Sequence, residues 1–214
     1  MPEIPLIQKV AIWALPLLFA ITLHEVAHGW VALCFGDRTA KYAGRLSLDP
    51  LKHIDPVGTV LVPLLMLLVS DFVFGWAKPV PVDQRNMKHP RIGMIVVALA
   101  GPTSNIVMAI IWSGIGKLAS LSGGVGISGA LVAMSEAGII INVVLAVLNV
   151  LPIPPLDGGR VLENIVPRRL GYVLSQLEPY SFIILILLIV TGLLSRFMSG
   201  PALYLINLIG GLFG

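Results

Sequence analysis

The sequence predicts an all-α polytopic membrane protein in which about five to six membrane-embedded segments surround a three-helix core. Its 214 residues are 57% hydrophobic and only 12% charged, with a mean hydropathy of +0.94, whereas soluble domains carry about 25% charged residues. Several apolar stretches approach the roughly 20 residues that cross a bilayer. The basic residues gather in loops between these stretches, as positive-inside topology requires.

The first apolar stretch, residues 7–35, predicts one long transmembrane helix that stops at Gly36. Only three ionisable residues interrupt it after Lys9, namely His24, Glu25 and His28. Residues 37–55 are polar and contain a turn-forming proline, so we expect an interfacial loop there.

Residues 57–75 are apolar but only marginally long enough to cross the bilayer, and they contain Pro63 and Asp71. Four basic residues precede this segment and four follow it, so a full span would leave one basic cluster outside. We therefore expect a short re-entrant, β-like loop that leads into the Pro-rich residues 77–82. A full span is the alternative.

Two more long helices are expected at residues 92–112 and 129–151, joined by an outer loop at the Gly- and Ser-rich residues 113–128. The second of them is broken by Pro152. Three basic clusters, at residues 38–52, 78–91 and 160–169, then lie on one side and hold all of the fourteen basic residues except Lys9, Lys117 and Arg196. This bias predicts a multi-pass protein of the cell membrane with its N-terminus outside.

The C-terminal part is expected to form an auxiliary hairpin. Residues 181–194 and 202–213 are apolar but short for spans, and Ser199-Gly200-Pro201 separates them. The chain is expected to form a single membrane-embedded domain, residues 1–214, with a core at about 7–165 and the hairpin at about 180–214.

The sequence His24-Glu25-Val26-Ala27-His28 predicts a zinc site. On a helix the two histidines stand one turn apart on the same face, so both imidazoles reach one Zn²⁺, while Glu25 flanks a bound water as general base. A chance match in a chain of this length is expected at about 1% or less. Inside a membrane helix, ionisable groups cost about 2.5 to 3.5 kcal/mol each, which favours a functional site.

A catalytic zinc needs a third protein ligand, and since Cys34 is the only cysteine, that ligand is a histidine or a carboxylate. His53 and His89 lie in basic interfacial loops. Asp157 is better placed, because it follows the Pro-rich break after the helix that ends at residue 151, although an ordinary Asp-Gly turn is also compatible with it. Glu136 is the rival carboxylate, near the opposite end of that helix.

Three motifs in the same order resemble the site-2 protease family of intramembrane zinc metalloproteases, over roughly residues 10–165. They are the His24–His28 motif, Gly101-Pro102-Thr103-Ser104-Asn105, and residues 149–160 with the sequence Asn-Val-Leu-Pro-Ile-Pro-Pro-Leu-Asp-Gly-Gly-Arg. The Gly75–Val82 loop is also similar. The chain resembles a minimal form, without a PDZ domain or a nucleotide-sensing domain.

The resemblance implies one zinc ion per chain, bound by His24, His28 and Asp157, with Glu25 as the catalytic base. It further implies that Asn105 and Asn149 hold the substrate backbone or the developing oxyanion. The expected activity is hydrolysis of peptide bonds in single-pass or other membrane-protein substrates, within or near the cytoplasmic half of the bilayer.

Other classes of function make different predictions. An ion transporter or channel would use the same His, Glu and Asp side chains to line a pathway. A scaffold with structural zinc is disfavoured, because such a site is normally closed by four protein ligands. A nucleic-acid-binding protein is also disfavoured, since the basic residues follow membrane topology. The expected partners are membrane-protein substrates and the lipid bilayer, with the oligomeric state and physiological substrate left open.

Overall fold

The computed structural model describes residues 6–61, 77–123 and 126–213, and these form helices and loops without a β-strand. The all-α class predicted from the sequence is therefore confirmed for this part of the chain. The elements are α1 (Leu6–Cys34), α2 (Thr39–Tyr42), η1 (Pro50–Lys52), η2 (Pro56–Leu61), η3 (Gln84–Asn86), α4 (Pro90–Leu121), α5 (Ile127–Val150), α6 (Asp157–Ile165), α7 (Arg168–Ser175), η4 (Glu178–Tyr180), α8 (Ser181–Val190) and α9 (Leu193–Gly210).

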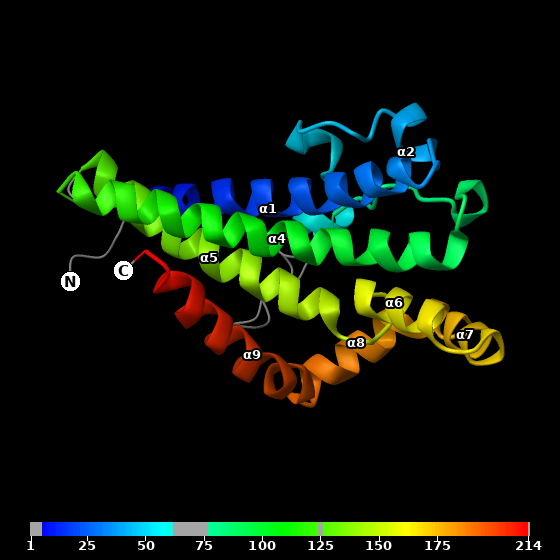
Figure 1. Ribbon diagram of the computed structural model, residues 1–214. Helices are drawn as coiled ribbons and strands as arrows, with labels where there is room; N and C mark the ends of the chain where they lie inside the picture. The colour runs from blue at the N-terminus through cyan, green and yellow to red at the C-terminus, as the bar shows by residue number, and fades with distance from the viewer. Residues whose placement is uncertain (1–5, 62–76, 124–125, 214) are drawn as a thin grey trace.

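Helices α1, α4 and α5 form the core, and each of them packs against the other two (Figure 1). Small residues let the helices approach closely, as is common between membrane helices. A Cβ added to Gly138 on α5 would lie 2.4 Å from the ring of Trp112 on α4. Helix α9 runs along α5 and completes an apolar cluster made by Ala109, Trp112, Ile139, Val143, Ala202 and Ile209.

In the part of the chain that the structure describes, three helices are long and apolar enough to cross a membrane, at Val10–Cys34, Pro90–Leu121 and Ile127–Val150. A fourth crossing is present only if the bent pair Arg168–Tyr180 and Ile183–Val190, which meet at 75°, counts as one span. Among the described residues this is fewer than the five to six embedded segments that we expected. Most of the expected re-entrant segment 57–75 lies outside the described residues.

Residues 77–83 are described and contain no regular secondary structure, so the β-like part of the expected loop is not seen there. Pro79 and Pro81 explain this difference. A proline has no N–H to donate to a neighbouring strand, and two of them at alternate positions deprive one edge of the segment of its donors.

Two predicted boundaries were wrong. Helix α4 does not end at residue 112 but continues to Leu121, where we had expected the loop 113–128. Gly116 explains the extension, because a Cβ there would lie 2.2 Å from Ser135 Oγ, so its small size lets α4 pack on α5. In the hairpin the break falls at Gly192, whose φ of 71° is in the left-handed region that favours glycine, while Pro201 lies inside α9.

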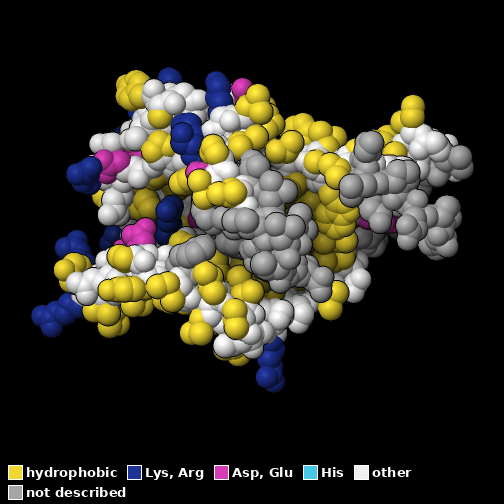
Figure 2. All heavy atoms as spheres, turned by 180° about the vertical axis from the view of Figure 1, so that it is seen from behind, with side chains coloured by type: hydrophobic (Ala, Val, Ile, Leu, Met, Phe, Trp, Pro, Cys, Tyr) yellow, Lys and Arg dark blue, Asp and Glu magenta, His cyan; other side chains and the backbone are white. Residues whose placement is uncertain are grey.

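The charged residues mark one end of the molecule. Figure 2 shows Lys and Arg side chains gathered mainly at the end formed by α2, α6 and α7, while apolar side chains cover much of the remaining face. This is the end where α1 and α5 finish and α4 begins. The three basic clusters of the sequence therefore lie at the same end of the helix bundle.

Candidate active site

The site forms where the C-terminal half of α1 meets the start of α6. His24 and His28 lie one turn apart on α1, and both side chains are buried. Asp157, the first residue of α6, directs its carboxylate at them. Its Oδ2 lies 3.2 Å from Nε2 of His24 and 3.3 Å from Nε2 of His28, and the two Nε2 atoms are 3.0 Å apart. The structure thus brings together the three residues that the sequence suggested as ligands.

Hydrogen bonds fix the orientation of the His24 ring. Its Nδ1 lies 2.6 Å from Oδ1 of Asn105, and the Asn105 amide group donates to the carbonyl of Ala20 at 3.2 Å and to Oδ1 of Asn142 at 2.9 Å. Asn142 in turn donates to the carbonyl of Gly138 at 2.8 Å. Because an amide oxygen only accepts, the Nδ1 atom of His24 carries a proton, so in the neutral ring Nε2 has the lone pair.

The His28 ring is oriented by the backbone of α4, since its Nδ1 donates to the carbonyl of Val97 at 2.7 Å. In the neutral ring its Nε2 then has a lone pair as well. Oδ2 of Asp157 is buried and receives no hydrogen bond from the described residues. With both rings neutral, three atoms offer lone pairs to one point, which is what a cation needs from its ligands.

The spacing of these three atoms fits zinc. Ligand atoms about 2.0 to 2.1 Å from a tetrahedral Zn²⁺ are about 3.3 to 3.4 Å from one another, close to the 3.0, 3.2 and 3.3 Å found here. Within the described part of the chain, His24, His28 and Asp157 form the one group of histidine and acidic side chains that could hold a metal ion. Three protein ligands leave the fourth zinc position available for water, as in catalytic sites.

Glycines let the neighbouring helices approach the cluster. A Cβ added to Gly101 on α4 would lie 2.5 Å from Cε1 of His24 and from Nε2 of His28. A Cβ on Gly158 would lie 2.2 Å from the carbonyl oxygen of Val150, at the end of α5. The glycines in the second and third motifs thus have a steric role, which sequence patterning did not assign to them.

Glu25 lies beside the cluster and is held by a loop that is distant in sequence. Its Oε2 accepts a hydrogen bond from the backbone N–H of Val80 at 2.7 Å. One carboxylate oxygen is thus fixed while the other is not engaged by the described residues. This contact was not predicted, because the donor is a backbone group and leaves no mark in the sequence.

The loops around Glu25 are tied together at Asp37. Its carboxylate accepts hydrogen bonds from the N–H of Thr39 at 3.0 Å, the N–H of Asp83 at 2.7 Å and the side chain of Asn86 at 3.2 Å. Burial raises the pKa of Asp37, but these bonds and one from the Thr39 hydroxyl outweigh it and hold that pKa below its ordinary value. An ionised Asp37 therefore joins the end of α1 to the 83–86 loop.

The rival ligand candidates His53, His89 and Glu136 are not part of the group formed by His24, His28 and Asp157. Nε2 of His53 is 2.8 Å from the carbonyl oxygen of Ser47, His89 precedes the first residue of α4, and Glu136 is exposed on α5. Asn149 lies in the last turn of α5, half-buried, and its amide group donates to the carbonyl of Leu145 at 3.0 Å. Asn105 is fully buried and uses its amide within the protein, as described above.

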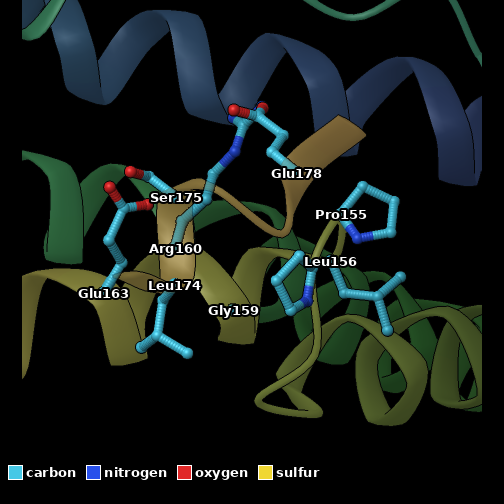
Figure 3. Close-up of a pocket in the computed structure, with 9 residues that line it drawn as sticks. Pro155, Leu156, Gly159, Arg160, Glu163, Leu174, Ser175 and Glu178 are labelled. Carbon is cyan, nitrogen blue, oxygen red and sulfur yellow. The ribbon is translucent and has the colours of Figure 1, made fainter. Parts of the chain in front are cut away.

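A small cavity lies on another side of α6. Figure 3 shows that it is lined by residues of the 154–163 segment, including Arg160 and Glu163, and by residues 174–178. Burial and then the charge of Glu178 raise the pKa of Glu163, which outweighs the effect of Arg160. The cavity measures about 20 Å³, room for about one water molecule. It contains none of the three ligand residues and is too small for a peptide.

Comparison with known proteins identifies the family. The sequence profile of peptidase family M50 matches residues 113–191. "Putative zinc metalloprotease YwhC" of Bacillus subtilis is 42% identical over 186 residues, which cover 83% of this chain and 79% of the relative. "Putative zinc metalloprotease Rip2" of Mycolicibacterium smegmatis is 29% identical over 207 residues, covering 89% and 74%. No solved structure matches. The chain therefore belongs to peptidase family M50, the site-2 protease family of zinc metalloproteases.

Proposed function

We propose that the protein is an intramembrane zinc endopeptidase that cleaves membrane-spanning proteins within or near the cytoplasmic half of the bilayer. One observation carries the proposal. A long apolar helix places two imidazoles, each with a hydrogen bond at Nδ1, at zinc spacing from a carboxylate oxygen that receives no hydrogen bond from the described residues. Beside them, the described residues hold Glu25 by one carboxylate oxygen.

The protein residues divide the chemical work. His24, His28 and Asp157 hold one zinc ion, which when bound lowers the pKa of water toward 7 and polarises a carbonyl group. Glu25 accepts the proton of the attacking water and passes it to the leaving amine. Asn105 and Asn142 keep the His24 ring in the tautomer that presents Nε2.

The substrate has to reach the site in an unwound form. The carbonyl groups of a transmembrane helix are already hydrogen-bonded, so a local break in the helix precedes attack. The half-buried Asn149, in the last turn of α5, is our candidate for a group that holds the unwound backbone or the oxyanion. The Pro-rich segment at residues 77–83, adjacent to Glu25, is our candidate for the surface along which the substrate lies.

The position of the site within the bilayer follows from the charges. His24 lies about 15 Å before the end of α1, at 1.5 Å per residue, and α1 ends in the basic part of the molecule. The positive-inside rule assigns this end to the cytoplasm and the N-terminus to the outside. The cleavage site is then within the membrane and near its cytoplasmic face.

The test is Glu25→Gln in the full chain, purified in detergent with zinc. We expect one zinc per chain and no cleavage of a synthetic single-pass peptide that carries a helix-destabilising Gly-Pro pair. The matched control is Glu136→Gln, which changes an exposed carboxylate on α5 and should cleave at the wild-type rate. Full cleavage by the Glu25→Gln protein would refute the proposal.

A transporter built on the same residues gives a different result. It predicts zinc flux into liposomes without cleavage of the peptide. Zinc flux and peptide cleavage are therefore both measured for the wild-type protein and for Glu25→Gln.

Proteomic comparison of membranes that contain the wild-type or the Glu25→Gln protein then identifies the physiological substrates, since uncleaved substrates accumulate with the inactive variant.

A further inference from the structure

Arg45 is buried, and among the described residues it has no carboxylate partner. The residue lies in the first loop, shortly after α2, and is only 8% exposed. In the described part of the chain no acidic group lies within ion-pair distance of it, and its Nε atom has no hydrogen-bond partner. A buried guanidinium is costly unless its interactions serve a purpose, and the mechanism above does not use this one.

The hydrogen bonds of Arg45 go to a short segment, residues 78–80, which we call the strap. Its Nη2 donates to the carbonyl oxygen of Lys78 at 2.5 Å and lies 3.5 Å from that of Pro79. The N–H of Lys78 donates to the carbonyl of His53 at 3.0 Å. The loop that contains Arg45 and His53 therefore holds the strap through hydrogen bonds at Lys78.

The other end of the strap is bound to Glu25. Val80 is buried between the exposed Pro79 and Pro81, and its N–H is the donor to Oε2 of Glu25. Arg45 and Glu25 thus hold the same segment two residues apart, the first through a carbonyl and the second through an N–H.

Gly29 allows the strap and the Arg45 loop to reach α1 beside the metal ligands. A Cβ at Gly29 would lie 2.5 Å from the side chain of Leu46 and 3.0 Å from that of Val80. Leu46 is the residue after Arg45, and Gly29 is the residue after His28. The loop, the strap and the zinc-binding turn of α1 therefore pack as one unit.

We propose that Arg45 is a positioning residue for catalysis: it fixes the strap so that the Val80 N–H holds the Glu25 carboxylate in the orientation for proton transfer. This inference rests on the proposed function, in which Glu25 is the base. Arg45 does not touch the substrate or the metal. Displacement of a reacting group by about 1 Å lowers a rate by up to about 100-fold. Substitution of Arg45 should therefore lower kcat.

The experiment compares Arg45→Met, Arg45→Lys and Val80→Pro with Arg38→Met in the zinc-loaded full chain, with the synthetic Gly-Pro peptide as substrate. Val80→Pro removes the N–H and keeps an apolar side chain of similar size, and its ring also fixes the backbone φ near about −65°. Arg38 is exposed and makes no side-chain hydrogen bond in the described structure, so its loss controls for the change in charge. Zinc content, kcat and KM are measured for each protein.

We expect Arg45→Met and Val80→Pro to lower kcat by about 10- to 100-fold, with KM within about twofold of wild type and full zinc content. Arg45→Lys should recover part of the loss, because its ammonium group still reaches one carbonyl. The double variant Arg45→Met/Val80→Pro should have the same kcat as Val80→Pro alone, since both substitutions break the same connection between Arg45, the strap and Glu25.

Wild-type kcat in Val80→Pro, or losses that multiply in the double variant, would overturn the inference. Loss of zinc or a large change in KM would also overturn it, because the role would then be structural. Should Arg45→Met fail to fold, Arg45→Lys and Val80→Pro decide the question. An active Glu25→Gln protein refutes the proposed function itself, whereas an inactive one together with a fully active Val80→Pro refutes this inference alone.

Discussion

Gly101→Ala should displace the zinc ligands although the substitution adds only one methyl group. The new Cβ would lie 2.5 Å from atoms of both His24 and His28, whereas the optimal separation of non-bonded carbon atoms is about 3.5 Å. The rings or helix α4 must therefore move by about 1 Å. Zinc–ligand distances vary by only about 0.2 Å, so the displacement caused by the added methyl group is about five times larger than this variation.

We expect the zinc affinity of Gly101→Ala to fall by at least about 10- to 100-fold, the range for changes next to metal ligands, or about 1.4 to 2.8 kcal/mol. Competition with a zinc chelator measures this. Gly114→Ala is the control on the same helix, since its Cβ would lie 3.8 Å from the Phe213 ring, an ordinary contact. Wild-type zinc affinity and cleavage in Gly101→Ala would refute the steric argument.

Two further predictions concern the polar side chains around the site. Asn105→Leu removes the acceptor for Nδ1 of His24, so zinc affinity measured by the same competition should fall about 10- to 100-fold, and an unchanged value would contradict the orienting role. Asp37 has a lowered pKa, so its contribution to stability is full above its ordinary pKa of about 4 and is lost as the pH falls through the lower folded-state value. The protection factors of the amides in residues 83–88, which compare the observed exchange rate with the intrinsic rate at the same pH, should therefore fall at acid pH. Asp37→Asn should show the lower protection already at pH 7, and protection factors in the wild type that do not change with pH would refute the assignment.

The parts of the site that could be predicted are those set by local helix geometry. His24 and His28 share a face because of the helical repeat, whatever the rest of the chain does. Asp157 could be proposed from the Pro-rich break before it, and the structure places it against both histidines. Asn142 and Asn149 are seven residues apart and so share a helix face, and the structure buries Asn142 within the helix bundle.

The remaining features depend on contacts between distant segments. In the sequence Arg45 is one of several basic residues in a loop. Its burial depends on the packing of the first loop against the strap, which the sequence does not reveal. The donor to Glu25 is a backbone N–H, which any residue except proline could supply. The extension of α4 to Leu121 likewise depends on a close approach between Gly116 and Ser135 that no single helix reveals.

The proposed ligands come from two separate helices, so metal binding would be coupled to the folding of the chain. His24 and His28 come from α1, whereas Asp157 begins α6, so a bound zinc ion cross-links the N-terminal helix to the segment that follows the core. At a zinc concentration 100 times the dissociation constant, this linkage would stabilise the docked arrangement by about 2.7 kcal/mol. Resistance to trypsin at Arg160, exposed on α6, would then report how much of the protein in a membrane carries zinc, without any substrate.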